Sequence, residues 1–225
     1  MVPNKKLELL KKNAQKSCDN CNGEGCSICA SRKDRMNQYA KAGIPILYWD
    51  LAFKDFKGDA RFAEQVKEIL VNMDSFYDLG ESIAFIGNLG TGKTYAACCI
   101  LKIALLSKFS CMYLNMSDII DRTTNNDKHF LEEITEVDIL CVDEFDLRWV
   151  YPSEKAEQLF GQTMERILRI RFQNKMPTII CSNTLELKNV LGANFSPSID
   201  SLFSKYVKSF FVVGKDFRKL KVKNA

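Results

Sequence analysis

The segment GNLGTGKT, residues 87–94, is the feature that most constrains how this chain can fold. It follows the apolar run SIAFI and precedes KTYAACCILKIALL, a stretch with the composition of a buried helix. A glycine-rich loop between a strand and a helix points successive backbone N–H groups at phosphate oxygens, beside the positive end of the helix dipole. The pattern GxxxxGK[ST] in this context therefore predicts an α/β protein with a phosphate-binding loop.

The side chains of this loop suit a nucleoside triphosphate. Lys93 is placed to neutralise the β and γ phosphates, and the Thr94 hydroxyl is placed to ligate Mg²⁺. A side chain at Gly90 or Gly92 would obstruct the approach of the backbone to the phosphates. The candidate nucleotide-binding residues are Gly87, Asn88, Leu89, Gly90, Thr91, Gly92, Lys93, Thr94 and Tyr95.

Polar residues also follow two further apolar runs. The run ITEVDILCVDEF contains Asp143 and Glu144, and PTIICSNT contains Asn183. In a parallel sheet, ligands bind at the carboxyl ends of the strands. We therefore expect Asp143 to hold the Mg²⁺ shell, Glu144 to orient or deprotonate the attacking water, and Asn183 to sense the γ phosphate. Asn115, after another run, either restrains Glu144 in an inactive pose or only forms a turn.

Apolar runs alternate with amphipathic stretches through most of the chain, which is typical of a parallel sheet covered on both faces. We divide the sequence into an N-terminal module, residues 1–41, and a body, residues 42–225, whose aromatic-rich segment 46–56 packs on the body. Strands are predicted at residues 82–86, 111–114, 138–142, 178–181 and 210–213. Helices are predicted at residues 4–16, 31–41, 60–77, 93–107 and 153–173.

The segment CDNCNGEGCSIC places four cysteines in two CxxC pairs: Cys18, Cys21, Cys26 and Cys29. Each pair can hold one side of a tetrahedral Zn²⁺, and the intervening glycines allow a tight reversal. These residues resemble the CxxCxGxG repeat of DnaJ-type zinc modules, and an iron–sulfur cluster is the alternative ligand. The other five cysteines lie among apolar residues and are interpreted as small hydrophobic side chains.

Charge is unevenly distributed within the net charge of +4. Residues 1–41 carry a net charge of +5 and residues 203–225 carry +6, so the intervening body is acidic. The basic ends either bind a polyanion or an acidic protein surface, or are solvated termini. The longest apolar stretch, residues 95–106, is shorter than the roughly 20 residues that span a bilayer, and we expect a soluble cytoplasmic protein without membrane partners.

Taken in order, the Walker A loop, the acidic Walker B strand and the Asn strand follow AGIPILYWDLAFKDF. Over residues 40–220 this arrangement resembles the AAA+ ATPases of the DnaC-type helicase-loader and IstB-type transposition family. The resemblance implies a P-loop fold of the ASCE division, with a five-stranded sheet in the order 5-1-4-3-2. It also implies ATP and Mg²⁺ at a subunit edge, and a ring or spiral that assembles on a replicative helicase.

The sequence departs from this family in two places. The resemblance implies an arginine supplied by the neighbouring subunit, but no arginine occurs between Arg171 and Arg218, and Lys205 occupies the equivalent place. Lysine lacks the planar fork of arginine, so the hypothesis is slow hydrolysis. The position of Arg218 resembles that of a second phosphate-sensing arginine. The alternative is that Arg218 is only one charge of a basic tail. Because the sequence ends soon after the last predicted strand, we expect no full C-terminal helical lid.

Three functions remain open at this point. The first is an ATP-dependent helicase loader that hydrolyses ATP slowly and binds single-stranded DNA weakly. The alternatives are an IstB-like transposition or DNA-targeting ATPase, and a nucleotide-gated adaptor with negligible hydrolysis. The cysteine module is expected to bind a protein partner, and binding to nucleic acid is the second interpretation. Arg166 and Arg169 either line a single-strand path or form a solvated face, and His129 is expected to be inert.

Overall fold

The computed structural model describes residues 2–125, 127–145, 154–183 and 197–217. The chain forms two compact units, Met1–Leu51 and Ala52–Ala225. Residues 42–51 go with the first unit because Trp49 packs edge-on against Tyr39, with 6.1 Å between ring centroids, and its Nε1–H donates to the Ile44 carbonyl at 2.8 Å. No helix in the described ranges is both long and apolar enough to cross a lipid bilayer.

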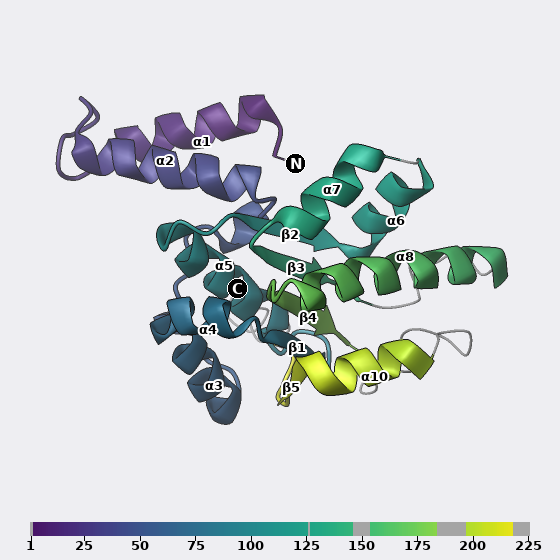
Figure 1. Cartoon of the computed structure of the whole chain (residues 1–225). Coiled ribbons are helices and arrows are strands. Elements are labelled where there is room, and N and C mark those ends of the chain that lie inside the picture. The colour runs from purple at the N-terminus through teal and green to yellow at the C-terminus, as the bar shows by residue number, and fades with distance from the viewer. Residues whose placement is uncertain (1, 126, 146–153, 184–196, 218–225) are drawn as a thin grey trace. The chain divides into compact units, whose positions relative to one another are not determined.

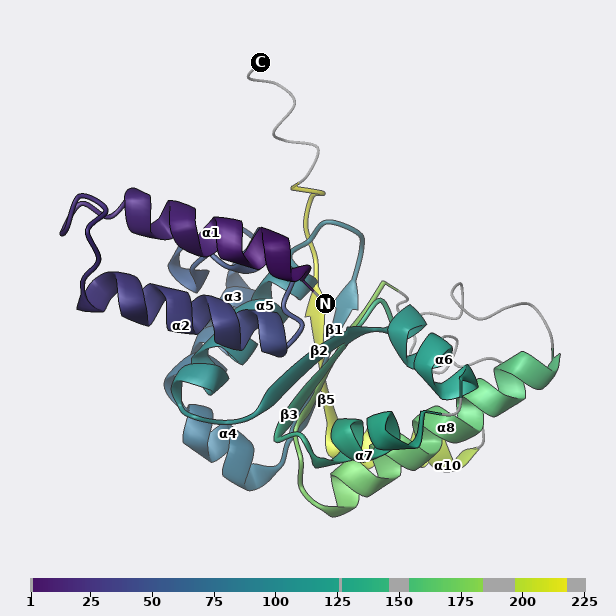
Figure 2. The same ribbon diagram turned by 90° about the horizontal axis from the view of Figure 1, so that it is seen from above.

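The N-terminal unit is a helical hairpin followed by the short 3₁₀ helix η1, Ile46–Tyr48. Helices α1, Asn4–Lys16, and α2, Ser27–Lys41, lie side by side in both ribbon views (Figures 1 and 2). The bounds predicted for the first helix are confirmed, whereas the second begins earlier than the predicted residue 31. The reason is that Cys26 takes the extended conformation of an N-cap residue, so the second CxxC pair starts the helix.

The second unit is built on a five-stranded sheet. Every paired neighbour is parallel, and the order is β2-β3-β4-β1-β5, which confirms the expected order 5-1-4-3-2. The strands are β1 (Ser82–Gly87), β2 (Cys111–Asn115), β3 (Ile139–Asp143), β4 (Thr178–Ser182) and β5 (Val207–Val212). The helical elements are η2 (Phe53–Asp55), α3 (Ala60–Val71), α4 (Met73–Leu79), α5 (Lys93–Leu106), α6 (Met116–Thr124), α7 (Lys128–Glu136), α8 (Glu154–Gln173) and α10 (Pro197–Tyr206).

Helices cover both faces of this sheet. Seen edge-on in Figure 2, α3, α4 and α5 lie on one side, and α6, α7, α8 and α10 lie on the other. The second face packs a continuous apolar core in which Phe130 of α7 and Leu168 of α8 meet Val142 of β3. Strands β1 and β3 are buried at every residue, as expected for central strands covered on both sides.

Two predicted elements differ in extent. The single helix predicted at residues 60–77 is wrong, because the backbone leaves the helical region at Asn72, whose φ and ψ are −111° and 43°, and a second helix starts there. Strand β5 begins at Val207 rather than at residue 210. This strand lies at an edge of the sheet, and its residues Lys208 and Ser209 are exposed. The start of the strand is therefore polar and was not predicted from the apolar run at residues 210–213.

A buried arginine joins the amino-terminal ends of two strands to α8. Arg171 is completely buried and is the largest fully buried side chain among the described residues. Its Nε donates to the Thr178 hydroxyl at 2.9 Å. Its terminal nitrogens donate to the carbonyls of Ile134, Val137, Asp138 and Pro177 at 2.7–3.2 Å. Burial lowers the pKa of Arg171 to about 10, so the guanidinium is charged at neutral pH.

Asp138 forms a second junction at the same edge of the sheet. Its Oδ2 accepts the backbone N–H and the hydroxyl of Ser110, each at 2.7 Å. Its Oδ1 accepts the Tyr77 hydroxyl of α4 at 2.9 Å. Burial opposes the charged carboxylate, but the bonds from Ser110 and Tyr77 outweigh it and lower the pKa of Asp138 below its ordinary value.

Candidate functional site

The phosphate-binding loop connects β1 to α5. Gly90 and Gly92 have φ values of 73° and 99°, a conformation that side chains disfavour, and Gly92 is the N-cap of α5. The Lys93 ammonium donates to the carbonyls of Gly87 and Asn88 at 2.8 and 2.7 Å, and only 6% of the residue is exposed. The loop is therefore curled around a buried cation at the start of a helix.

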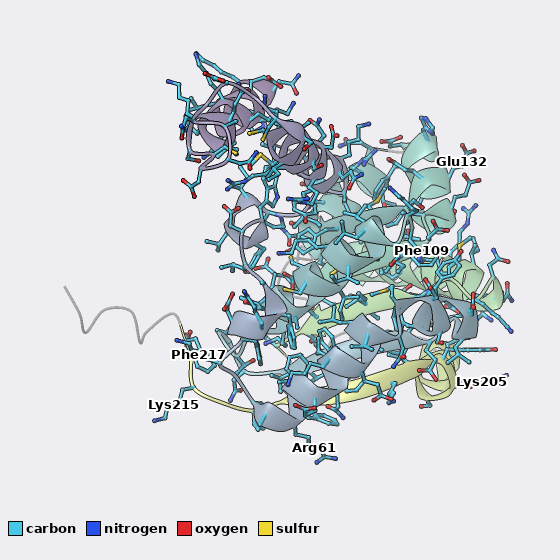
Figure 3. The ribbon with its side chains drawn as sticks, turned by 90° about the vertical axis from the view of Figure 1, so that its left-hand side faces the viewer. Arg61, Phe109, Glu132, Lys205, Lys215 and Phe217 are labelled. Carbon is cyan, nitrogen blue, oxygen red and sulfur yellow. The ribbon has the colours of Figure 1, made fainter. Side chains whose placement is uncertain are left out.

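Two segments distant in sequence approach the glycines of this loop. A Cβ atom at Gly92 would lie 2.5 Å from Cε2 of Phe56, and one at Gly90 would lie 1.8 Å from Oδ1 of Asp216. The backbone N–H of Phe217 donates to the Gly90 carbonyl at 3.1 Å. The residues after β5 therefore pass over the loop, and Figure 3 shows Lys215 and Phe217 where the strand ends. Substitution of either glycine would displace a neighbour.

An aromatic cluster lies beside the loop. Phe53 and Phe56 stack with 5.2 Å between ring centroids, and Tyr95 packs against both at 6.5 and 5.6 Å. Burial raises the pKa of Tyr95 to about 12, and its hydroxyl donates to the Ala52 carbonyl. Phe56 continues the contacts to Phe62, with 5.8 Å between centroids. These contacts fix the start of the body against α5.

The carboxylate pair lies at the end of β3. Asp143 is 6% exposed, and its Oδ1 accepts the backbone N–H of Glu144 at 2.9 Å. Its Oδ2 accepts the Tyr113 hydroxyl at 2.6 Å. Burial, followed by the charge of Asp143, raises the pKa of Tyr113 well above its ordinary value, so this hydroxyl is a donor. Glu144 is exposed and adopts a left-handed backbone, with φ 52°.

The strand order brings the separate motifs to one edge of the sheet. Strand β4 lies between β1 and β3, so Asn183, the partly buried residue after β4, stands between the loop and the carboxylates. Thr94 is the second residue of α5, and Leu89, at the loop, is half exposed. The hydroxyl of Thr91 is held by the Asn88 carbonyl at 2.9 Å. The loop, Thr94, Asp143, Glu144 and Asn183 thus share the carboxyl edge of the sheet.

Lys205 is not at this edge. It lies in the last turn of α10, directly before β5, and Figure 3 shows it at the opposite end of that strand from Lys215. It is exposed, and its Nζ lies 5.0 Å from the centroid of the Tyr206 ring. A role for Lys205 in ATP hydrolysis would therefore require the site of a neighbouring subunit. Arg218 lies outside the described residues.

The remaining charged candidates lie on surfaces. Arg169 of α8 is paired with Glu165 at 2.6 Å, while Arg166 is exposed. The side chain of His129 is 95% exposed. Asn115 is the N-cap of α6, where its backbone N–H donates to Asp118 at 3.1 Å, as the turn-forming interpretation expected.

The residues at the carboxyl edge fit a magnesium–triphosphate group. A buried ammonium and the start of a helix provide positive potential beside the loop. Asp143 is a buried carboxylate whose oxygens are oriented by the Tyr113 hydroxyl and the Glu144 backbone N–H, and a carboxylate oxygen suits a hard cation. The arrangement can therefore hold the group at the loop and present it to Glu144.

The four N-terminal cysteines form a second site. Their sulfurs all lie within 4.8 Å of one another, with 3.9 Å between Cys18 and Cys26, 3.5 Å between Cys21 and Cys29, and 3.8 Å between Cys26 and Cys29. A tetrahedral ion with metal–sulfur bonds of about 2.3 Å holds its ligands about 3.8 Å apart. The Cys29 backbone N–H lowers the pKa of Cys26 to about 6. These thiols fit one metal ion.

The other five cysteines are buried, which confirms their interpretation as small hydrophobic side chains. They are Cys98, Cys99, Cys111, Cys141 and Cys181. Burial raises the pKa of Cys99 to about 11 and that of Cys111 to about 12, so these thiols are protonated at neutral pH.

Three residues of the site were not recognised from the sequence: Tyr113, Phe56 and Asp216. Tyr113 reads as an ordinary strand residue, and its only signal is that it lies two positions before Asn115 on the same side of β2. Phe56 belongs to the aromatic segment that was expected to pack on the body. Asp216 has no signal, because its approach to Gly90 depends on where β5 ends.

A five-stranded parallel sheet in this order, with a glycine-rich loop after β1 and a carboxylate pair after β3, is an AAA+-like α/β fold. No protein-family model matches the sequence, and no curated protein is significantly similar to it. Solved structures are similar to it in fold.

The most relevant of these structures come from DNA replication. A crystal structure of the DnaC helicase loader superposes with a TM-score of 0.62 at 17% identity, covering 75% of this chain and 100% of that one. DnaI gives a TM-score of 0.61 at 16% identity, covering 77% and 93%. The initiator DnaA, bound to AMPPCP and single-stranded DNA, gives 0.58 at 19% identity, covering 80% and 56%. At such identities the similarity shows the fold.

Proposed function

We propose that this chain is a cytoplasmic, ATP-dependent helicase loader, which binds and slowly hydrolyses ATP with Mg²⁺ to control the assembly of a replicative helicase on single-stranded DNA. The observation that carries the proposal is that buried Lys93, buried Asp143 and exposed Glu144 lie at the same carboxyl edge of the sheet. Support for the helicase as partner comes from the similarity of the fold to that of the DnaC helicase loader.

In this proposal each residue has a separate task. The loop and Lys93 bind the phosphates, and Thr94 and Asp143 hold Mg²⁺, which when bound neutralises charge on the β and γ phosphates. Glu144, which faces solvent, orients the attacking water, and Asn183 contacts the γ phosphate from β4. The left-handed backbone of Glu144 stores strain of the kind that active sites hold.

Hydrolysis is proposed to be slow. Lys205 lies at the opposite edge of the sheet from the loop of its own chain, so it acts only on a neighbouring copy. Its compact ammonium stabilises the transition state less well than a planar guanidinium would. Nucleotide then serves mainly to control self-association into a ring or spiral, and Arg218 stays a candidate phosphate sensor.

The cysteine site is proposed to hold Zn²⁺. The spacing between the sulfurs matches a single tetrahedral ion, whereas an iron–sulfur cluster distributes its thiolates over several irons and holds them farther apart. A zinc-stabilised hairpin is a rigid surface on which the helicase docks. Weak binding of single-stranded DNA is assigned to the basic residues of the chain.

Affinity purification of a Glu144→Gln variant from its source cells tests the proposal. Loss of the water-orienting carboxylate is expected to trap the ATP-bound assembly, and a hexameric helicase should co-purify. Lys93→Ala is the matched control, which should recover no helicase. Recovery of a transposase would favour the transposition ATPase. Recovery of the helicase together with no measurable phosphate release by wild-type protein, with or without single-stranded DNA, would favour the adaptor.

A further inference from the structure

Tyr113 has no role in the function proposed so far, yet it contacts the most deeply buried carboxylate of the site. It lies on β2, is 7% exposed, and its hydroxyl donates to Oδ2 of Asp143 at 2.6 Å. The same hydroxyl lies 3.3 Å from Oδ1 of Asn115. We propose that Tyr113 is a positioning residue, whose hydroxyl fixes the Asp143 carboxylate in the orientation that holds Mg²⁺. This inference rests on the proposed function.

The hydroxyl has one proton and two neighbouring acceptors. The distance to Asp143 is the shorter, and a charged acceptor forms the stronger bond, so the hydroxyl donates its proton toward Asp143 rather than toward Asn115. Because both residues are buried, the bond is stronger than it would be in water. Asn115 is the weaker acceptor of the two.

The carboxylate of Asp143 is held at both oxygens. Oδ1 accepts the backbone N–H of Glu144 at 2.9 Å, and Oδ2 accepts the hydroxyl of Tyr113. Two donors on different oxygens oppose rotation of the carboxylate and therefore fix the direction of its remaining lone pairs. Partners of this kind, which orient a metal ligand without touching the metal, typically change metal affinity about 10–100-fold when they are removed.

The sheet holds Tyr113 itself in place. In the parallel register of β2 and β3, Tyr113 pairs with Cys141 and Asn115 pairs with Asp143. The Tyr113 side chain therefore reaches diagonally along β3 to the aspartate at its end. A donor on a strand paired in the sheet is less mobile than one on a loop, as a positioning role requires.

The chain supplies a matched control for removing this hydroxyl. Tyr77 also donates a hydroxyl to an aspartate, Asp138, at 2.9 Å, but Asp138 directly precedes β3 and lies at the opposite edge of the sheet from the loop. Tyr113→Phe and Tyr77→Phe thus each delete one tyrosine–aspartate hydrogen bond. Only the first deletes a bond to the proposed Mg²⁺ ligand.

The experiment measures binding of a fluorescent ATP analogue to the full, zinc-loaded chain, in EDTA and over a Mg²⁺ titration. Tyr113→Phe is expected to raise the Mg²⁺ midpoint about tenfold, while its affinity in EDTA stays within about twofold of wild type. Tyr77→Phe should keep the wild-type midpoint. In an Asp143→Asn background, adding Tyr113→Phe should change nothing further, because the hydroxyl acts through the carboxylate.

The outcomes separate the inference from the function on which it rests. Failure of the wild-type chain to bind the analogue would overturn both. A normal Mg²⁺ response in Tyr113→Phe, or an equal shift in Tyr77→Phe, would overturn the positioning role alone. If Tyr113→Phe does not fold, Tyr113→Met, which also lacks the hydroxyl, replaces it in the same titration: a raised Mg²⁺ midpoint supports the inference, and a wild-type midpoint contradicts it.

Discussion

Replacing Arg171 by methionine tests how the amino-terminal edge of the sheet is held. Methionine keeps an unbranched side chain of similar length but removes donors to Thr178 and to four carbonyls. One of these, the Pro177 carbonyl, also accepts the Leu140 N–H at 3.2 Å and so keeps a partner. The other acceptors lose about 1 kcal/mol each, which predicts a loss of about 3–4 kcal/mol in the free energy of unfolding.

Urea unfolding followed by far-UV circular dichroism measures this loss. Arg169→Met, on the same helix, is the matched control, because its pair with Glu165 is partly exposed and should contribute less than about 0.5 kcal/mol. Arg171→Lys keeps the charge but has fewer donors, so it should fall between wild type and methionine. A loss below about 1 kcal/mol for Arg171→Met would refute the assignment of these bonds as a main support of the edge.

Three further predictions concern the two sites and the second junction. Lys93→Ala should weaken ATP binding at least about 100-fold in calorimetry, because it removes the cation proposed to bind the phosphates; near-normal affinity would contradict the site. Cys29→Ser should lower the zinc content by metal analysis and reduce helical circular dichroism, since metal binding stabilises so small a unit; an unchanged zinc content would contradict a four-thiolate site. Tyr77→Phe should cost about 1 kcal/mol at neutral pH. Since the folded-state pKa of Asp138 lies below its ordinary value, that carboxylate stabilises the fold above the ordinary pKa and loses this effect as the pH falls through the folded-state value. The penalty should therefore shrink in strong acid, and one that is constant down to that range would argue against the bond.

The sequence predicted the central strands well because burial on both faces leaves uninterrupted apolar runs, as in β1 and β3. Strand β5 was harder, because only Phe210 and Val212 of it are buried, and the exposed polar residues Lys208 and Ser209 precede them. The break between α3 and α4 was missed because the apolar stripe continues across it: Val66 and Met73 are both buried. Periodicity therefore records burial but not where the backbone turns.

The candidate site shows the same division between local and distant information. The loop is specified by neighbouring residues, so its position between a strand and a helix could be predicted. The hydroxyl of Tyr113 and the carboxylate of Asp216 reach the site from segments far away in sequence. These contacts could not be predicted from a single sequence, because each of the two residues is of a type that is common in strands or turns.

The difference between the N-terminal cysteines and the buried cysteines of the body allows metal occupancy to be measured by thiol reactivity. Five thiols are buried in the body, and those at Cys99 and Cys111 have raised pKa values, so a mild thiol reagent should not reach them in the folded protein. With Zn²⁺ bound as proposed, colour developed with such a reagent would come from the N-terminal thiols and appear as the ion leaves. The rate of metal exchange could thus be followed in unlabelled protein, with no engineered cysteine and no fluorescent dye.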